Sequence, residues 1–239
     1  MVLIIIATCA LLWSLESLIP LYANRHRVRH AIPNVALTAI VFAMNLTLSF
    51  LAALASAQAI PNRLPVWMQL VLAIAALDLS TYVAHVSLHK WPLAWRFHRV
   101  HHSDEAVNVT TAFRQHPCES VWRVVWQLPA IFLLGIPTWM LAIYLALSAA
   151  NAQLEHANIR VPERFDRLVR LLFVTPNMHK VHHSRSQHET DSNYANLFSL
   201  WDRLFGTYTA RTDFGTLRYG LDGLNGRGLL SLLRLPFAQ

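Results

Sequence analysis

The sequence predicts an all-α integral membrane protein with about four transmembrane helices and a cytoplasmic helical cap that holds a histidine-rich dimetal site. Three observations support this class. The chain of 239 residues is 54% hydrophobic and only 14% charged, whereas soluble domains carry about 25% charged residues. Apolar runs alternate with short basic segments, as in proteins that cross a bilayer. Thirteen histidines are present, and most recur at helical spacings.

Four apolar runs are long enough for the roughly 20 residues that cross a bilayer. They are Met1 to about Tyr22, Pro33–Ile60, Val66 to about Leu88, and Val121 to about Ala152. The first run has neither the positively charged start nor the small-residue end of a signal peptide, so we expect a membrane helix. Gly135 and Pro137 interrupt the fourth run, which predicts two helical pieces or a hairpin that returns to its starting side.

Arginine placement predicts the orientation. Arg25, Arg27 and Arg29 follow the first run, and basic loops stay in the cytoplasm. The second run then leaves the cytoplasm and the third returns, so residues 90–123 and the basic C-terminal third are expected to be cytoplasmic. The N-terminus would face outward. In a bacterium this would be the inner membrane.

The basic charge does not indicate a nucleic-acid-binding protein. The net charge is +7, but no basic stripe with interleaved aromatic residues is present, and most arginines flank apolar runs. Such arginines suit a surface that faces anionic lipid headgroups. Cys9 and Cys118 form neither a metal-binding spacing nor a disulfide framework.

Histidine spacing is the strongest chemical signal. His85 and His89 lie four residues apart at the end of the third run, so both rings can share one helix face. Asp78 falls on the same face and is expected to hold an imidazole N–H.

Two hexapeptides, HRVHHS at 98–103 and HKVHHS at 179–184, each add three histidines. A helical spacing of three or four places His98 with His101 or His102 on one side. The adjacent pair diverges by one helical step, so one segment can serve two neighbouring metals. Thr175 and Pro176 are a natural N-cap and first-turn residue for the second hexapeptide. Both hexapeptides are therefore expected to be helical.

Simpler readings are a pH-sensing cluster or a structural zinc site. Structural zinc takes four ligands, often including cysteine, whereas the pair and two triplets supply eight histidines. A site with two metals would use all eight histidines, whereas a single structural zinc would use four. His156 stands alone near the end of the fourth run, while His116 and His188 are isolated. Imidazole suits iron, copper, nickel and zinc, and oxidation of lipid C–H bonds favours iron.

The series DLSTYVAHVSLH, HRVHHS, FRQHPCE, LEHAN, HKVHHS and DSNYANLFSLWDRLFGTY resembles the fatty acid hydroxylase superfamily, whose bacterial members are often called sterol desaturase family proteins. The resemblance runs from about Leu77 to Tyr208. It implies an integral membrane, non-haem di-iron enzyme that uses O₂ and reducing equivalents to hydroxylate or desaturate lipids. On this basis we expect N-terminal transmembrane helices over 1–64, a catalytic domain over 65–210 and a cytoplasmic tail over 211–239.

The resemblance also implies the site residues. The expected metal ligands are His85, His89, His98, His101, His102, His156, His179, His182 and His183. Some relatives have a second histidine four residues before the isolated one, where this chain has Ala152. His116 matches a recurring His-Pro segment and is expected behind the ligands or in the substrate pocket. By position alone, Asp78, Asp191, Asn193 and Tyr194 are further candidates to hydrogen-bond the ligand rings, although the last three could instead form an ordinary polar turn. No side chain is needed as a separate nucleophile.

The expected cofactors are two iron ions with O₂ as co-substrate, and zinc could replace iron in a recombinant preparation. No Gly-rich dinucleotide fingerprint or CxxCH haem motif is present, so an external ferredoxin or cytochrome with its reductase is the expected electron donor. The substrate remains open among sterols, fatty acyl chains, ether lipids and carotenoids. The alternatives are a metal-handling membrane protein and a metal-dependent lipid hydrolase, although the HExxH and GxSxG motifs are absent.

Overall fold

The computed structural model describes residues 2–24, 26–58, 63–224 and 228–238, and this part of the chain is helical with only isolated β-bridges. The longer helices are α1 (Val2–Leu18), α2 (Arg27–Ala57), α3 (Val66–Lys90), α4 (Pro92–His102), α5 (Pro117–Leu133) and α6 (Thr138–His156). The short ones are η1 (Val109–Phe113), α7 (Glu163–Val169), α8 (Pro176–His182), α9 (Gln187–Thr190), α10 (Leu200–Leu204), α11 (Leu229–Arg234) and η2 (Leu235–Phe237).

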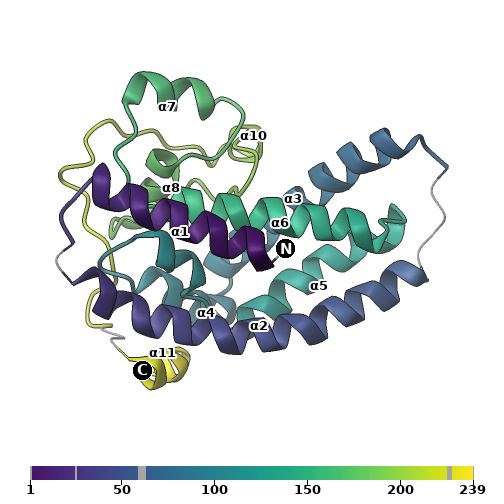
Figure 1. Cartoon of the computed structure of the whole chain (residues 1–239), viewed down its shortest axis with the longest axis horizontal. Coiled ribbons are helices and arrows are strands. Elements are labelled where there is room, and N and C mark those ends of the chain that lie inside the picture. The colour runs from purple at the N-terminus through teal and green to yellow at the C-terminus, as the bar shows by residue number, and fades with distance from the viewer. Residues whose placement is uncertain (1, 25, 59–62, 225–227, 239) are drawn as a thin grey trace.

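The long helices form an elongated bundle in which α2, α3, α5 and α6 pack together and α1 lies along α6 (Figure 1). Its core includes Leu77 of α3, Ile131 of α5 and Tyr144 of α6, all fully buried. The fourth apolar run is divided into α5 and α6 at Gly135, whose φ is 61°, and Pro137 is the N-cap of α6. This break was expected, because glycine adopts positive φ without a Cβ clash.

Among the described residues, α2 and α3 are long and apolar enough to cross a membrane. They contain 31 and 25 residues, against the roughly 20 that a bilayer requires. Only 17% of the most apolar window of α2 is buried, so its apolar side chains face outward and α2 is unlike a core helix of a soluble protein. Four separate spans are not evident in the described part of the chain: α1 has 17 residues, and α5 and α6 run in opposite directions from the turn at Gly135 (Figure 1).

One expected boundary is wrong. The arginine-rich segment before Pro33 was expected to be a loop, but α2 begins at Arg27 and contains Pro33. In the first turn, His30 contacts Asp104 at 2.6 Å, and Asn34 accepts a hydrogen bond from Arg114. These contacts with the segment after α4 hold the early turns in helical form. The expected ends at Met1 and Ile60 lie outside the described residues.

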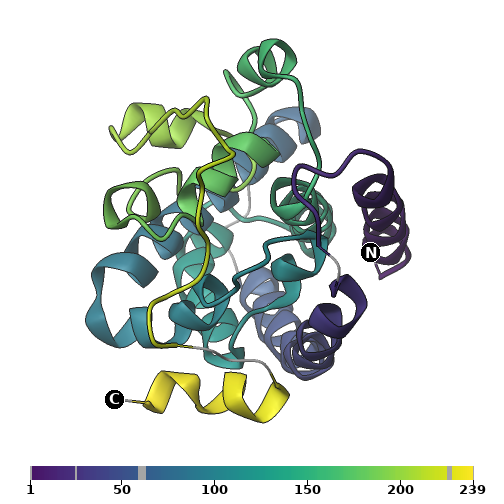
Figure 2. The same ribbon diagram turned by 90° about the vertical axis from the view of Figure 1, so that its left-hand side faces the viewer.

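The other half of the molecule is a cap of short helices (Figures 1 and 2). Asp78 joins it to the bundle: its carboxylate accepts hydrogen bonds from the backbone N–H groups of Leu197 and Phe198 and from the indole of Trp201. The C-terminal segment crosses the cap face and ends in α11, which packs on α2 and α4 around Leu37, Val100 and Leu232. The described parts of the three expected segments, residues 1–64, 65–210 and 211–239, therefore pack against one another.

Candidate metal centre

Four helices bring histidines to one point inside the molecule. The C-terminal half of α3 carries His85 and His89, and α4 carries His98, His101 and His102. Helix α6 ends at His156. In α8, Thr175 accepts a hydrogen bond from the Met178 N–H and Pro176 occupies the first turn, as expected from the sequence. This helix presents His179 and His182, and its C-cap is His183.

The nine side chains form two compact groups in which the nitrogen atoms lie within 4.8 Å of one another. Cluster A consists of His85, His89, His98, His102 and His182. Cluster B consists of His101, His156, His179 and His183. In each hexapeptide the two consecutive histidines belong to different clusters, because consecutive helical residues point about 100° apart. The clusters are neighbours: the stacked rings of His102 and His183 have centroids 4.7 Å apart.

The spacing within each cluster fits metal coordination. In cluster A the Nε2 atom of His98 lies 3.0 Å from that of His85 and 3.2 Å from that of His102. In cluster B the Nε2 atom of His156 lies 3.0 to 3.1 Å from those of His101, His179 and His183. Metal–imidazole bonds of about 2.0–2.1 Å place neighbouring ligand atoms about 3.0–3.4 Å apart.

These contacts cannot all be ordinary hydrogen bonds. The Nδ1–H of His85 donates to the Tyr194 carbonyl, and the Nδ1–H of His98 donates to Glu119. A neutral imidazole has one proton, so the facing Nε2 atoms of these two rings both carry lone pairs. A cation between them would turn this repulsion into attraction. The buried Nε2 atoms of His89 and His182 have no hydrogen-bond partner among the described residues, and the same cation would satisfy them.

Burial favours the neutral, metal-binding form of the rings. The pKa of His101 and that of His182 are well below the ordinary value, first because the rings are desolvated and second because other histidines surround them. The same causes lower the pKa of His102, His179 and His183. Because metals bind deprotonated imidazole, the rings are already in the required form.

Cluster A is held by oxygen atoms behind its rings. His85 donates to the Tyr194 carbonyl at 2.7 Å, and His182 donates to the Ser192 carbonyl at 2.7 Å. The Nδ1 atom of His98 lies 3.0 Å from Glu119, which is fully buried and also pairs with Arg123. The Nδ1 atom of His89 lies 3.5 Å from Asp191. Such partners fix ring orientation and raise ligand basicity.

Cluster B has fewer such supports. His156 contacts the Ala152 carbonyl through Nδ1 at 2.5 Å. The buried Nδ1 atoms of His101, His179 and His183 have no hydrogen-bond partner among the residues that the structure describes. Cluster B therefore has one ring fewer and weaker orientation of the rings it has.

Both clusters thus offer buried, convergent imidazoles that are able to hold metal ions. A sequence profile for Fatty acid hydroxylase matches residues 70–207, more than half of the chain, and this range contains all nine histidines. The chain belongs to the fatty acid hydroxylase family.

Curated relatives in this family act on lipids by their names. The ornithine lipid hydroxylase OlsE of Rhizobium tropici is 29% identical over 182 residues, which cover 75% of this chain and 53% of OlsE. The alkylglycerol monooxygenase of Danio rerio is 31% identical over 150 residues, covering 63% of this chain and 32% of that protein. The human alkylglycerol monooxygenase is 30% identical over 151 residues. The chain therefore spans about half the length of OlsE and a third of the Danio rerio enzyme. No solved structure matches it.

Two of the residues expected beside the family's histidines support cluster A. The carboxylate of Asp191 contacts His89 and the ammonium group of Lys90, and these two partners hold the pKa of Asp191 well below its usual range. Tyr194 contributes its backbone carbonyl to His85, and its hydroxyl donates to Asp191. Both residues therefore lie behind the rings of cluster A, and the tyrosine contacts His85 through its main chain.

Other expected residues have structural roles. Asp78 contacts no histidine ring in the described structure and instead accepts the hydrogen bonds that join α3 to the segment before α10. Asn193 has a φ of 53°, in the left-handed region that asparagine tolerates, and its amide bonds to Met178 and Thr209. His116 is the N-cap of α5, where its ring accepts from the Cys118 N–H. His188 is exposed on α9.

Sequence reasoning missed two carboxylates. Glu119 lies in the segment FRQHPCE and contacts His98, but only the histidine of that segment was predicted as a site residue. Glu155 is buried, and one of its oxygens lies 3.6 Å from Nε2 of His179. Both are charged residues beside apolar runs, a signal that could have marked them. The Ser192 carbonyl had no sequence signal, because every residue has one.

Proposed function

We propose that this chain is an O₂-dependent lipid hydroxylase in which clusters A and B each hold one iron ion. The observation that carries the proposal is the pair of adjacent, buried imidazole clusters in a chain of the fatty acid hydroxylase family. The nine cluster histidines would be the ligands. Iron bound there would supply the activation of O₂ that oxidation of an unactivated C–H bond requires.

The protein's own residues determine how such a site works. Glu119, Asp191 and the Tyr194 carbonyl hold the rings of cluster A in orientation. Burial of both clusters excludes bulk water. Bulk water would otherwise occupy coordination positions and react with the activated oxygen. Zinc would fit the same imidazoles, so a recombinant chain can carry zinc without being active.

Hydroxylation of a polar membrane lipid is the reaction we favour. The names of OlsE and the alkylglycerol monooxygenases describe hydroxylation of an ornithine lipid and mono-oxygenation of alkylglycerols. In this reaction one C–H bond becomes C–OH, the second oxygen atom of O₂ becomes water, and a donor supplies two electrons while two protons are taken up. Desaturation by the same residues would consume the same reductant but leave no oxygen in the lipid.

We place the site at the cytoplasmic surface of a membrane, in a bacterium the inner membrane. The apolar helices α2 and α3 support a membrane location, and the arginines at the start of α2 support this orientation. Helix α1 and the α5–α6 hairpin would lie beside them in the bilayer. Residues 65–210 would be the catalytic segment, with residues 1–64 as its N-terminal membrane helices and residues 211–239 as a tail.

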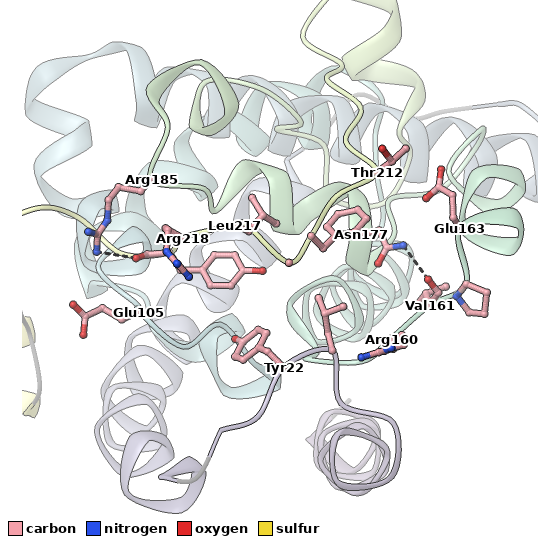
Figure 3. A pocket seen from close by; sticks show the side chains of 15 residues that line it. Tyr22, Glu105, Arg160, Val161, Glu163, Asn177, Arg185, Thr212, Leu217 and Arg218 are labelled. Atoms are coloured by element: carbon pink, nitrogen blue, oxygen red, sulfur yellow. Dashed lines mark hydrogen bonds between the residues drawn. The ribbon is translucent and has the colours of Figure 1, made fainter.

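The electron donor would dock beside α8. A hollow of about 760 Å³ opens there, and Figure 3 shows Arg160, Arg185 and Arg218 around it together with Glu105 and Glu163. Arg185 follows His183 by two positions, so this hollow is close along the chain to cluster B. A reduced ferredoxin or cytochrome with an acidic face would complement the three arginines.

The docking proposal is tested with a double variant, Arg185→Glu and Arg218→Glu. We expect its KM for reduced ferredoxin to rise about tenfold or more and its dependence on salt to reverse, because the attraction becomes a repulsion that salt screens. Metal content should remain unchanged. An unaltered KM would place the donor elsewhere.

The function itself is tested by comparing lipids from cells that express the chain with those that express its His182→Ala variant, with and without O₂. We expect one lipid class to gain a single oxygen atom only with the intact chain and only in air. Loss of two hydrogen atoms would indicate desaturation. Turnover without O₂ would indicate a hydrolase, and metal flux into liposomes without lipid change would indicate a transporter.

A further inference from the structure

An apolar surface on the side of the cap has no role in the site described above. It is formed by Phe165, Leu168, Leu171, Leu172, Leu200 and Leu204, and we call it the lateral patch. These side chains are between 44% and 69% exposed. Clustered large apolar side chains on a surface mark a contact with a protein or a lipid.

The two parts of the lateral patch are joined by direct hydrogen bonds. The Ser199 N–H donates to the Leu172 carbonyl at 3.0 Å, and the Arg203 guanidinium donates to the Arg170 carbonyl at 3.0 Å. The turn that follows α7 and the start of α10 are thus fixed against each other. The two parts of the patch are therefore neighbours in the fold.

The contacts of α10 place the lateral patch beside the apolar helix α3. The Trp201 indole donates to Asp78, and the Phe205 ring stacks on the Tyr82 ring with centroids 5.3 Å apart. Asp78 and Tyr82 lie about 12 to 18 Å before the end of α3 at Lys90, given a rise of 1.5 Å per residue. The α10 part of the patch is therefore level with the apolar helix and not beyond its end.

Basic side chains border the same surface. Arg164 and Arg167 are exposed on α7, and Arg203 is exposed on α10. Arginine places its charged end at the level of lipid phosphates while its stem covers apolar surface. Apolar side chains bordered by arginines are the pattern of helices that lie in the interface of an anionic bilayer.

We propose that α7 and α10 lie within the headgroup and upper acyl region of the cytoplasmic leaflet, with the lateral patch facing lipid. The proposal rests on the membrane location given under the proposed function. It adds that the cap is partly embedded, because α10 packs on the apolar helix α3 and the turn after α7 is bonded to the start of α10.

The test uses single cysteines that carry an environment-sensitive fluorophore, in a chain with Cys9→Ala and Cys118→Ser, in anionic phospholipid nanodiscs. Labels go on Leu168→Cys of α7 and Leu204→Cys of α10, which are 68% and 69% exposed. Leu46→Cys of α2, 59% exposed, is the membrane control. Asp222→Cys is the aqueous control, because that side chain is 83% exposed. Metal content shows that each variant folds.

The labels on α7 and α10 should lose most of their fluorescence to a nitroxide on the lipid headgroup or upper acyl chain, and little to iodide in water. Quenching by iodide instead would overturn the proposal. Protection from both quenchers would also overturn it, because a second copy would then cover the patch. If the α2 label is not quenched by lipid either, the membrane location itself fails; if only the α7 and α10 labels escape, this proposal alone fails.

Discussion

Clusters A and B share helices α4 and α8, yet the protein supports them differently. Cluster A has five rings, and four of them meet an oxygen atom through Nδ1: His85, His89, His98 and His182. Cluster B has four rings, and only that of His156 has such a contact among the described residues. Preorganised ligands bind metal more tightly, so the fold builds one firm position and one open position.

The difference suits the proposed chemistry. The five imidazoles of cluster A, four of them held by an oxygen atom, would position a metal, whereas the four rings of cluster B would leave room for an external ligand. Ala152 lies one helical turn before His156 of cluster B, and its methyl group offers no ligand atom there.

The largest effect is expected from removing one ring of either cluster. His182→Ala in cluster A and His101→Ala in cluster B should each reduce lipid oxidation to background, because the reaction needs both metals. The measurement is product formation in membranes that contain equal amounts of folded protein. Substantial activity in either variant would show that its cluster is dispensable.

A smaller effect is expected when only the support is removed. Glu119→Gln should weaken metal binding at cluster A about 10- to 100-fold, since the carboxylate no longer polarises His98, and leave cluster B unchanged. Competition with a chelator measures both affinities. Glu163→Gln is the matched control: Glu163 also pairs with an arginine at 2.6 Å but lies outside both clusters. Equal losses in the two variants would contradict a specific role for Glu119.

The intact chain should release its two metals in two phases. We expect cluster B to lose metal about tenfold faster than cluster A, because its rings are fewer and less anchored. Stopped-flow chelation gives the two rates, and the single-site variants assign them. A single phase, or faster release from cluster A, would contradict the comparison.

The smallest effect is expected at a feature that the clusters share. Thr175→Ala removes the N-cap of α8 and should cost about 1 kcal/mol of stability, seen as a lower Tm. Both clusters should be affected equally, since α8 serves both. Thr175→Ser keeps the hydroxyl and should restore the Tm. A preferential loss of metal from one cluster would show that α8 does not hold the two together.

Much of the site could be predicted because its information is local. On any helix, a spacing of four residues places His85 and His89 on the same face, whereas the consecutive residues His101 and His102 point in different directions. The division of α5 from α6 followed equally from Gly135. The assignment of each ring to its cluster could not be read, because it depends on how α4, α6 and α8 pack.

The features that sequence reasoning missed depend on tertiary contacts. Asp78 has helical spacing to His85, but hydrogen bonds from the segment before α10 occupy its carboxylate. The start of α2 at Arg27 depends on the contact between His30 and Asp104, which lie far apart in the chain. The carbonyls that hold His85 and His182 belong to the backbone and have no residue-specific signal.

The most direct test of the account is the metal content of the purified chain after reconstitution with iron, measured beside its single-cluster variants. The two clusters predict two iron ions per intact chain, and one in each variant that loses two rings of a single cluster, His98→Ala with His182→Ala or His101→Ala with His156→Ala. One ion or fewer in the intact chain, or two retained in both variants, would contradict the claim that clusters A and B are separate metal positions.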